Sequence, residues 1–167
     1  MLSPMGTYAS LETPLDKFTV AVDSNGVVTA AVFGDESVLR TRCPKDIFVR
    51  NAKAASKVLA QVDEWFAGKR REFSVPLLPA GTPFQQRVWR AVSQIPYGET
   101  RSYAYIAKAV KSSTRAVGRA VATNPVCLLI PCHRVIGING AITGYAFGKD
   151  RKRYLLDFER KHRRNYG

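Results

Sequence analysis

A proline-rich stretch near the middle of the chain, "FSVPLLPAGTP" from Phe73 to Pro83, separates two halves with different hydrophobic patterns. Proline lacks a backbone N–H and fixes its own φ angle, so this stretch can continue neither a helix nor a central strand. We therefore place a domain boundary between about Val75 and Thr82. The chain should form two domains, residues 1–78 and residues 79–167.

The first half has the pattern of an α/β (α+β) domain with a short antiparallel sheet. In "FTVAVDSNGVVTAAVF", two runs rich in β-branched residues flank Asn25-Gly26, and this dipeptide is a strong signal for a hairpin turn. Further on, "NAKAASKVLAQVDEWFAG" carries apolar residues at helical spacing, and Gly68 follows as a stop signal. A hairpin and a helix are expected here.

The second half reads as mainly helical. "PFQQRVWRAVSQI" places its apolar residues on one helical face, and "PYGET" ends the pattern. Two short helices, "SYAYIAKAV" and "TRAVGRAVATN", follow on either side of "KSS", and they form a helix-turn-helix candidate over about residues 102–123. Arg115 and Arg119 share one face of the second helix. Its many small residues fit either close approach to DNA or packing against the protein's own core.

Charge is distributed unevenly between the two halves. Of a formal net charge of +13, residues 1–78 contribute 10 basic and 9 acidic side chains, whereas residues 79–167 contribute 16 basic and 4 acidic side chains. Such asymmetry is typical of a module that binds a polyanion, with nucleic acid the leading candidate. The alternative is a solvated basic tail, because "KDRKRYLLDFERKHRRNYG" holds much of the charge.

Several classes of protein are not supported by the composition. No apolar run approaches the roughly 20 residues that a membrane span needs, and the N-terminal residues do not resemble a secretory signal. Three cysteines and two histidines, with no CxxC pair, suggest neither a disulfide framework nor a zinc site. We expect a cytoplasmic protein, or a nuclear one in a eukaryote, with no membrane partner and no bound metal.

The stretch "LLIPCHRVIG" places a cysteine, Cys132, beside a histidine, His133, after an apolar run and a proline. Cys132 could be a small buried hydrophobe. It could also be a nucleophile, because a thiol reacts as the thiolate and a nearby base can remove its proton. Side chains of adjacent residues usually point apart, so proton transfer would depend on the local backbone or on a bridging water. The spacing alone leaves both interpretations open.

A longer pattern surrounds this pair. "RAVGRAVATNPVCLLIPCHRVIG", from Arg115 to Gly137, closely resembles the active-site region of the O6-alkylguanine-DNA alkyltransferases. Upstream, "GTPFQQRVWRAVSQIPYGETRSYAYIA" resembles the segment that leads into the helix-turn-helix of that family, and downstream "GAITGYAFGKDRKRYLLDFE" is similar to its closing segment. The resemblance covers about Thr82 to Glu159, is weaker over "VDEWFAGKRREFSVPL", and contributes little in the first 55 residues.

This resemblance implies a ribonuclease H-like first domain, a winged helix-turn-helix second domain and a direct-reversal DNA repair activity. The protein would be a methylated-DNA–protein-cysteine S-methyltransferase, which flips the damaged nucleotide out of the duplex and inactivates itself by a single alkyl transfer. Its partner would be double-stranded DNA containing O6-alkylguanine. No cofactor is required, because the alkyl group passes directly to sulfur. We expect a monomer; cooperativity on DNA and activity on O4-alkylthymine are left open.

The resemblance also assigns roles to residues. Cys132 would accept the alkyl group, His133 would act as its base through a water, and Glu159 would orient His133. Asn124 would form a turn beside the site, and Tyr103 would donate to the departing guanine. Lys152 would add charge or hydrogen bonding near the pocket. Arg115 would enter the base stack, and the other DNA-binding residues would be Arg119, Thr114, Ala116 and Ser102. The pocket would be lined by Tyr145, Gly144, Ile142, Phe147 and Val135.

Two residues depart from the family pattern. Phe147 stands where many members have a small residue, so its ring could narrow the pocket and make bulky adducts poorer substrates. Lys149 adds charge where an apolar residue is common. Cys127, on the apolar run, is expected to be a buried structural thiol, and Cys43 has no supporting context.

Three other functions compete with alkyl transfer. One is an alkyltransferase-like protein that only recognises alkylated guanine, but such proteins lack the acceptor cysteine. Another is a helix-turn-helix transcription factor, although "TRAVGRAVAT" has few side chains suited to reading base edges. The third is a cysteine hydrolase, for which no oxyanion element is evident.

Overall fold

The computed structural model describes residues 5–165, and the chain divides into two compact units. The first unit comprises the residues up to Ala80 together with Pro125–Leu129, and the second comprises Gly81–Asn124 together with the residues from Ile130 onward. The domain boundary predicted from the sequence assigns residues 125–129 to the second half. They join the first unit because they pair with Ala31 through two backbone hydrogen bonds. The N–H of Ala31 donates to the carbonyl of Pro125, and the N–H of Cys127 donates to the carbonyl of Ala31, each over 2.9 Å.

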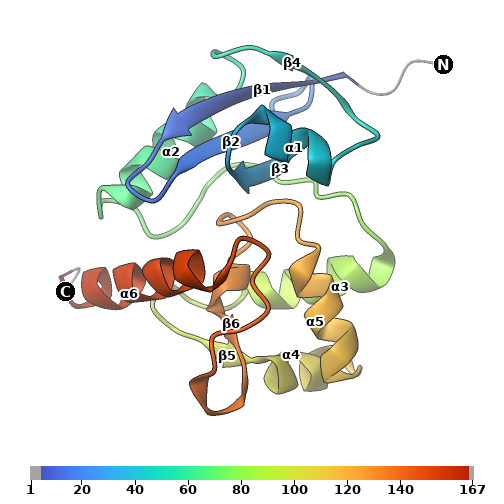
Figure 1. Ribbon diagram of the computed structural model, residues 1–167, viewed down its shortest axis with the longest axis vertical. Coiled ribbons are helices and arrows are strands. Elements are labelled where there is room, and N and C mark those ends of the chain that lie inside the picture. The colour runs from blue at the N-terminus through green and yellow to red at the C-terminus, as the bar shows by residue number, and fades with distance from the viewer. Residues whose placement is uncertain (1–4, 166–167) are drawn as a thin grey trace. The chain divides into compact units, whose positions relative to one another are not determined.

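The first unit is built on a four-stranded sheet with the strand order β3-β2-β1-β4 (Figure 1). Strands β1 (Met5–Glu12), β2 (Lys17–Val22) and β3 (Val28–Phe33) are successive antiparallel neighbours, which confirms the hairpin at Asn25-Gly26. Strand β4 (Ile47–Arg50) pairs with β1 in parallel. The expected antiparallel sheet is formed by β1, β2 and β3, and the parallel strand β4 extends it into a mixed sheet.

Two helices complete the core of the first unit. Helix α1 (Glu36–Arg42) contacts β3, and helix α2 (Ser56–Phe66) contacts β1. The α2 residue Phe66 lies edge-on to Phe33, which in turn lies edge-on to Phe18. Almost every residue of β2 and β3 is buried. The free edge of β3 is covered by residues 76–78, since the N–H of Val28 donates to the carbonyl of Pro76 (2.9 Å).

Three helices form the centre of the second unit, and all lie where the sequence pattern indicated. Helix α3 (Pro83–Ser93) begins with a capping box formed by Thr82 and Gln85. Helices α4 (Tyr103–Val110) and α5 (Thr114–Ala122) follow, capped by Ser102 and Ser113. The indole N–H of the buried Trp89 donates to the carbonyl of Ala120 (2.8 Å), which fixes α3 against α5.

The remainder of the second unit brings distant segments together. A 3₁₀ turn, η1 (Cys132–Arg134), leads into β6 (Val135–Ile136), which pairs in parallel with β5 (Arg101–Ser102). A second 3₁₀ turn, η2 (Ile138–Gly140), precedes helix α6 (Lys149–Asn165), which packs on η1. Within residues 5–165, no helix combines the length and apolarity needed to cross a membrane.

Candidate active site

The short turn η1 carries Cys132 and His133 into the interior of the second unit. The N–H of Cys132 donates to the carbonyl of Ile130 (2.8 Å), and the N–H of Arg134 donates to the carbonyl of Pro131 (2.9 Å). These tight bonds fix the backbone around the thiol. Cys132 is 3% exposed and His133 is fully buried. The backbone of the Cys132–His133 pair is therefore fixed, and both side chains are shielded from water. The sequence alone does not specify these surroundings.

Helix α6 supplies the group that orients His133. Lys152 and Glu159 are seven residues apart on the same face of α6 as Leu155, and all three are buried. The Nε2 atom of His133 lies 2.8 Å from the Oε2 atom of Glu159. A carboxylate can only accept hydrogen bonds, so Nε2 carries the proton. The Nδ1 atom of a neutral His133 is then left with an unprotonated lone pair.

Nδ1 of His133 is buried and has no hydrogen-bond partner among the described residues. A buried acceptor without a partner is unusual in a native structure and points to a functional use. The tautomer makes this nitrogen the basic atom of the ring. His133 can thus take up a proton at Nδ1 while Glu159 holds the opposite side of the ring.

Arg134, for which the sequence predicts no role, is the second partner of Glu159. Its guanidinium donates from Nη2 to Oε2 (2.8 Å) and from Nε to Oε1 (2.9 Å). Its Nη1 atom donates to the carbonyl of Ile95 (2.7 Å). Glu159 also accepts from the N–H of Gly98 (3.3 Å). The only signal in the sequence was that a glutamate on an apolar helical stripe needs a partner when it is buried.

The pKa values of Glu159 and His133 are both lowered, but for different reasons. Burial by itself would raise the pKa of Glu159, but the adjacent His133 and Arg134 outweigh it and lower this pKa to about 2. Burial also lowers the pKa of His133, and the nearby Arg134 adds to that effect, whereas Glu159 opposes it. At neutral pH the site therefore contains an ionised Glu159 and a neutral His133.

Tyr103 and Lys152 meet beside Cys132. Both donate to the carbonyl of Thr143, at 2.9 Å from the Tyr103 hydroxyl and 2.7 Å from the Lys152 amine, and Lys152 also donates to the carbonyl of Val135. Burial and the negative charge of a Cys132 thiolate raise the pKa of Tyr103 to about 12. Burial lowers the pKa of Lys152 to about 8, although the thiolate opposes this. Tyr103 is thus a stable hydroxyl donor, and Lys152 is still mostly a cation at neutral pH.

Gly144 allows this close approach of Tyr103 to the loop before α6. Its φ angle is +73°, and a Cβ atom built there would lie 2.5 Å from the Tyr103 hydroxyl oxygen. Any side chain at this position would displace the Tyr103 ring. The resemblance had placed Gly144 in the pocket, and the structure gives a physical reason for a glycine next to Tyr103.

Asn124 supports the backbone before Cys132, and the residues expected to line the pocket lie in and before the loop that leads into α6. The side-chain amide of the buried Asn124 donates to the carbonyl of Ile130 (3.0 Å), so it braces the segment that ends at Cys132. The Tyr145 and Phe147 rings contact each other edge to face with centroids 5.9 Å apart. The side chain of Val135 is fully buried, and Ile142 is half-buried in the same loop.

The residues expected to contact DNA lie mostly on the open face of α5. Thr114, Arg115 and Arg119 are exposed, and Ala116 is half-buried. The remaining member of this set, Ser102, has a structural task, because its hydroxyl accepts from the N–H of Tyr105 (3.0 Å) and caps α4. A Cβ atom built at Gly118 would meet nothing within 4 Å, so packing inside the protein does not require a glycine there.

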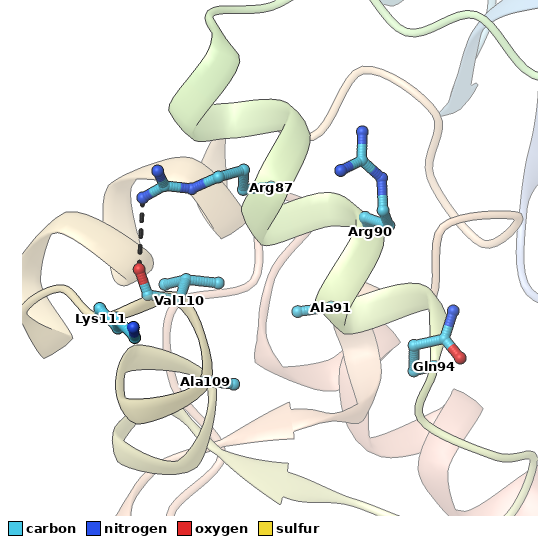
Figure 2. Close-up of a pocket in the computed structure, with 7 residues that line it drawn as sticks. All are labelled: Arg87, Arg90, Ala91, Gln94, Ala109, Val110 and Lys111. Carbon is cyan, nitrogen blue, oxygen red and sulfur yellow. Dashed lines mark hydrogen bonds between the residues drawn. The ribbon is translucent and has the colours of Figure 1, made fainter.

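A groove of about 540 Å³ lies between α3 and the end of α4 (Figure 2). Figure 2 shows Arg87 reaching across it to the carbonyl of Val110 (3.2 Å), with Arg90 one turn further along α3. Lys111, at the opposite wall, ends α4 in the left-handed conformation (φ 56°). No carboxylate lines the groove. This basic surface begins directly before the turn into α5, and no sequence pattern singled out its residues.

No group of three or more metal-binding side chains occurs within the described part of the chain. The arrangement consists of a thiol, a neutral imidazole oriented by a carboxylate, a phenol and a lysine. Chemically, these parts can supply a cysteine nucleophile and a histidine base oriented by a glutamate, and they are carried on a helix-turn-helix domain with an exposed basic face.

Comparison with known proteins agrees with this architecture. Residues 83–161 match the family model described as "6-O-methylguanine DNA methyltransferase, DNA binding domain", and residues 7–79 match the corresponding "ribonuclease-like domain". The chain therefore belongs to the 6-O-methylguanine DNA methyltransferase family.

Individual relatives cover almost the whole chain. A methylated-DNA–protein-cysteine methyltransferase of Mycobacterium bovis is 50% identical over 92% of this chain and 92% of its own length. The constitutive protein of that name from Bacillus subtilis is 42% identical, over 93% of this chain and 96% of its own length. The crystal structure of the Mycobacterium tuberculosis O6-methylguanine methyltransferase superposes with a TM-score of 0.83 at 40% identity, covering 95% of this chain and 94% of that one.

The low pKa of Glu159 predicts an acid-sensitive stability. Because the folded-state pKa, about 2, is below the ordinary value of 4.5, the ionised carboxylate stabilises the fold above pH 4.5, and this contribution is lost as the pH falls towards 2. Glu159→Gln should therefore lower the free energy of unfolding at pH 7, by about 3 kcal/mol. The difference from the wild type should shrink between pH 4.5 and 3 in urea unfolding experiments. A difference that does not change with pH would show that Glu159 is not held as an anion.

Proposed function

We propose that this protein repairs DNA by direct reversal, transferring the alkyl group of an O6-alkylguanine in duplex DNA to its own Cys132. The observation that carries the proposal is the buried His133–Glu159 pair. Because Nε2 of His133 donates its proton to Glu159, the Nδ1 atom is left unprotonated and basic, on the residue next to Cys132. Membership of the methyltransferase family supports the same chemistry. The protein would act where the genome lies, in the cytoplasm of a prokaryote or the nucleus of a eukaryote.

The proposed reaction is a single displacement at carbon. Nδ1 of His133 takes the proton of the Cys132 thiol through a water molecule, and Glu159 stabilises the imidazolium that forms. The thiolate forms a bond to the alkyl carbon while the bond between that carbon and guanine O6 breaks, and the electron pair passes to the guanine. Overall the thiol proton ends on the guanine, and the sulfur carries a stable thioether. Each molecule therefore reacts once.

Tyr103 and Lys152 would serve the departing base. A phenol with a pKa of about 12 keeps its proton at neutral pH, so Tyr103 can donate to the guanine as negative charge develops on it. The Lys152 amine lies 5.6 Å from the centre of the Tyr103 ring, close enough to stabilise that charge. Asn124 would hold the backbone before Cys132 in place, and Tyr145 and Phe147 would form part of the pocket wall.

The target must leave the base stack to reach Cys132. Nucleotide flipping costs a few kcal/mol, less for a poorly paired damaged base, and an inserted side chain can fill the gap. Arg115 is exposed near the start of α5 and is the candidate for this role. Arg119 lies one turn further along the same face and would contact the backbone.

The stoichiometry of transfer gives the direct test. After incubation with a duplex containing one O6-methylguanine, the intact protein should gain the mass of one methyl group and no more, and peptide mapping should place it on Cys132. Cys132→Ser should gain no mass and should still bind the duplex. Tight binding by the wild type without a mass gain would instead support a protein that only recognises the lesion.

Gly118 gives a second test of how α5 is used. A glycine inside a helix is destabilising by about 1 kcal/mol relative to alanine, and Gly118→Ala meets open space, so the variant should be more stable in thermal unfolding. If α5 lies against DNA, the added methyl group should nevertheless weaken duplex binding and slow alkyl transfer. Ala122→Ser, on the same exposed face at the far end of the helix, is the matched control. A Gly118→Ala protein with unchanged binding would exclude close backbone contact at this position.

The groove in Figure 2 predicts salt-dependent binding. Lys111→Gly removes a charge and relieves a left-handed lysine, so the fold should be retained or stabilised. If Lys111 and Arg90 contact phosphates, Lys111→Gly and Arg90→Gln should each weaken DNA binding and reduce the slope of log affinity against log salt concentration by about one. Lys57→Gln, which removes an exposed charge from α2, is the control and should leave the slope unchanged. Equal slopes for all three variants would exclude a phosphate contact in the groove.

A further inference from the structure

Leu128, four residues before the acceptor cysteine, has a disfavoured backbone conformation. Its φ angle is +71°, and only 2% of its surface is exposed. This left-handed region is uncommon for residues other than glycine, and a bulky leucine there is an outlier. A strained backbone of this kind persists only where the surrounding structure enforces it, and such residues cluster at functional sites.

The strain at Leu128 belongs to a tight turn. The N–H of Leu129 donates to the carbonyl of Cys127 over 2.8 Å, which closes a three-residue γ-turn around Leu128. With a positive φ angle at its central residue, this is the rare and strained form of the γ-turn. The chain therefore reverses sharply just before the active site.

A second, relaxed γ-turn connects this reversal to the acceptor. It is centred on Pro131 (φ −81°, ψ 61°), and the N–H of Cys132 donates in it to the carbonyl of Ile130 over 2.8 Å. The same carbonyl accepts from the side-chain amide of Asn124 (3.0 Å). The position of the Ile130 carbonyl thus sets the position of the Cys132 backbone.

The chain is anchored on both sides of Leu128. Before it, the N–H of Cys127 donates to the carbonyl of Ala31 (2.9 Å), and after it Asn124 holds Ile130. Only residues 128 and 129 remain to redirect the chain between these two anchors. The left-handed conformation of Leu128 supplies that change of direction.

We propose that Leu128 is a positioning residue for alkyl transfer: its buried side chain enforces the left-handed turn, and the turn places the Ile130 carbonyl that holds the N–H of Cys132. This inference rests on the proposed function, because it concerns the acceptor in that reaction. Displacement at carbon requires close alignment of the attacking atom, so a small shift of the Cys132 backbone should slow the transfer strongly.

The variants Leu128→Ala and Leu128→Gly separate the side chain from the backbone conformation. Both lose the packing that enforces the turn. Alanine keeps the penalty against a positive φ angle, so its turn should open, whereas glycine adopts this conformation freely and should retain the turn. Leu128→Gly should therefore have a midpoint of thermal unfolding about 2 to 4 °C above that of Leu128→Ala.

Leu129 is the matched control, because it is buried in the same segment (8% exposed) and lies outside the left-handed region. Glycine there only adds backbone freedom, so Leu129→Gly should unfold at a lower temperature than Leu129→Ala. If alanine were the more stable choice at Leu128 as well, the backbone strain would be absent and the proposal would be overturned.

The rate of transfer distinguishes positioning from a purely structural role. Single-turnover methyl transfer is measured with saturating duplex, well below the unfolding temperature of every variant. Leu128→Ala should be about tenfold slower than the wild type, and Leu128→Gly should recover most of this loss, with the dissociation constant for DNA unchanged in both. A purely structural role would lower the unfolding temperature of both variants but leave their saturating rates equal to that of the wild type, and this result would refute the positioning role.

Amide hydrogen exchange reports on the same turn without DNA. The N–H of Val117 in α5, which donates to the carbonyl of Ser113 (3.1 Å), serves as the reference for the stability of the second unit. Relative to this reference, the N–H of Cys132 should exchange about tenfold faster in Leu128→Ala than in Leu128→Gly. Equal relative exchange in the two variants would contradict the proposal.

The two kinds of failure can be told apart. A protein whose unfolding and exchange follow these expectations, but whose wild type gains no methyl group from alkylated DNA, would refute the proposed function and leave the role of Leu128 in placing Cys132 intact. A wild type that accepts the methyl group, with equal saturating rates in all the Leu128 variants, would retain the proposed function and refute the role of Leu128.

Discussion

The buried carboxylate of Glu159 is the constraint on which the second unit depends. An ionised carboxylate costs several kcal/mol to remove from water unless charged and polar partners replace its hydration. Here the network joins three separate parts of the chain: α6 carries Glu159, and its partners are His133 and Arg134 from η1 and the N–H of Gly98 from the loop after α3. Moving any one of these segments would leave a buried charge without its partners. The same network that fixes the fold therefore fixes the orientation of the histidine.

Lys152 is a second fixed point on α6, two turns before Glu159. Its amine binds the carbonyls of Val135 and Thr143, which lie on either side of η2. The loop before α6 is thereby held close to Tyr103, and Gly144 removes the steric barrier to that contact. Together, the two polar residues on the buried face of α6 position both ends of the site. One end holds the base, and the other holds the phenol that would face the guanine.

The sequence indicated local structure well, because local structure depends on local pattern. The proline-rich stretch at residues 73–83, the Asn25-Gly26 hairpin and the helices around residues 83–122 all lie where the pattern predicted. The parallel pairing of β4 and the pairing of residues 125–127 with β3 join segments far apart in sequence, and no short-range signal specifies them. Arg134 was missed for a similar reason. Its partner is 25 residues away, and its neighbours in the sequence do not reveal the direction of its side chain.

Gly118 and Lys111, two positions of the helix-turn-helix, go against the usual local preferences. Gly118 weakens the middle of α5 although no atom approaches the space that a Cβ would fill, and Lys111 adopts a conformation that favours glycine. The buried network around Glu159 makes no such compromise. Both positions lie on the surface, in or next to the basic helix-turn-helix, where a bound partner can reach them. Under the proposed function, close approach of a DNA backbone would account for the missing side chain at the first and would make use of the positive charge at the second.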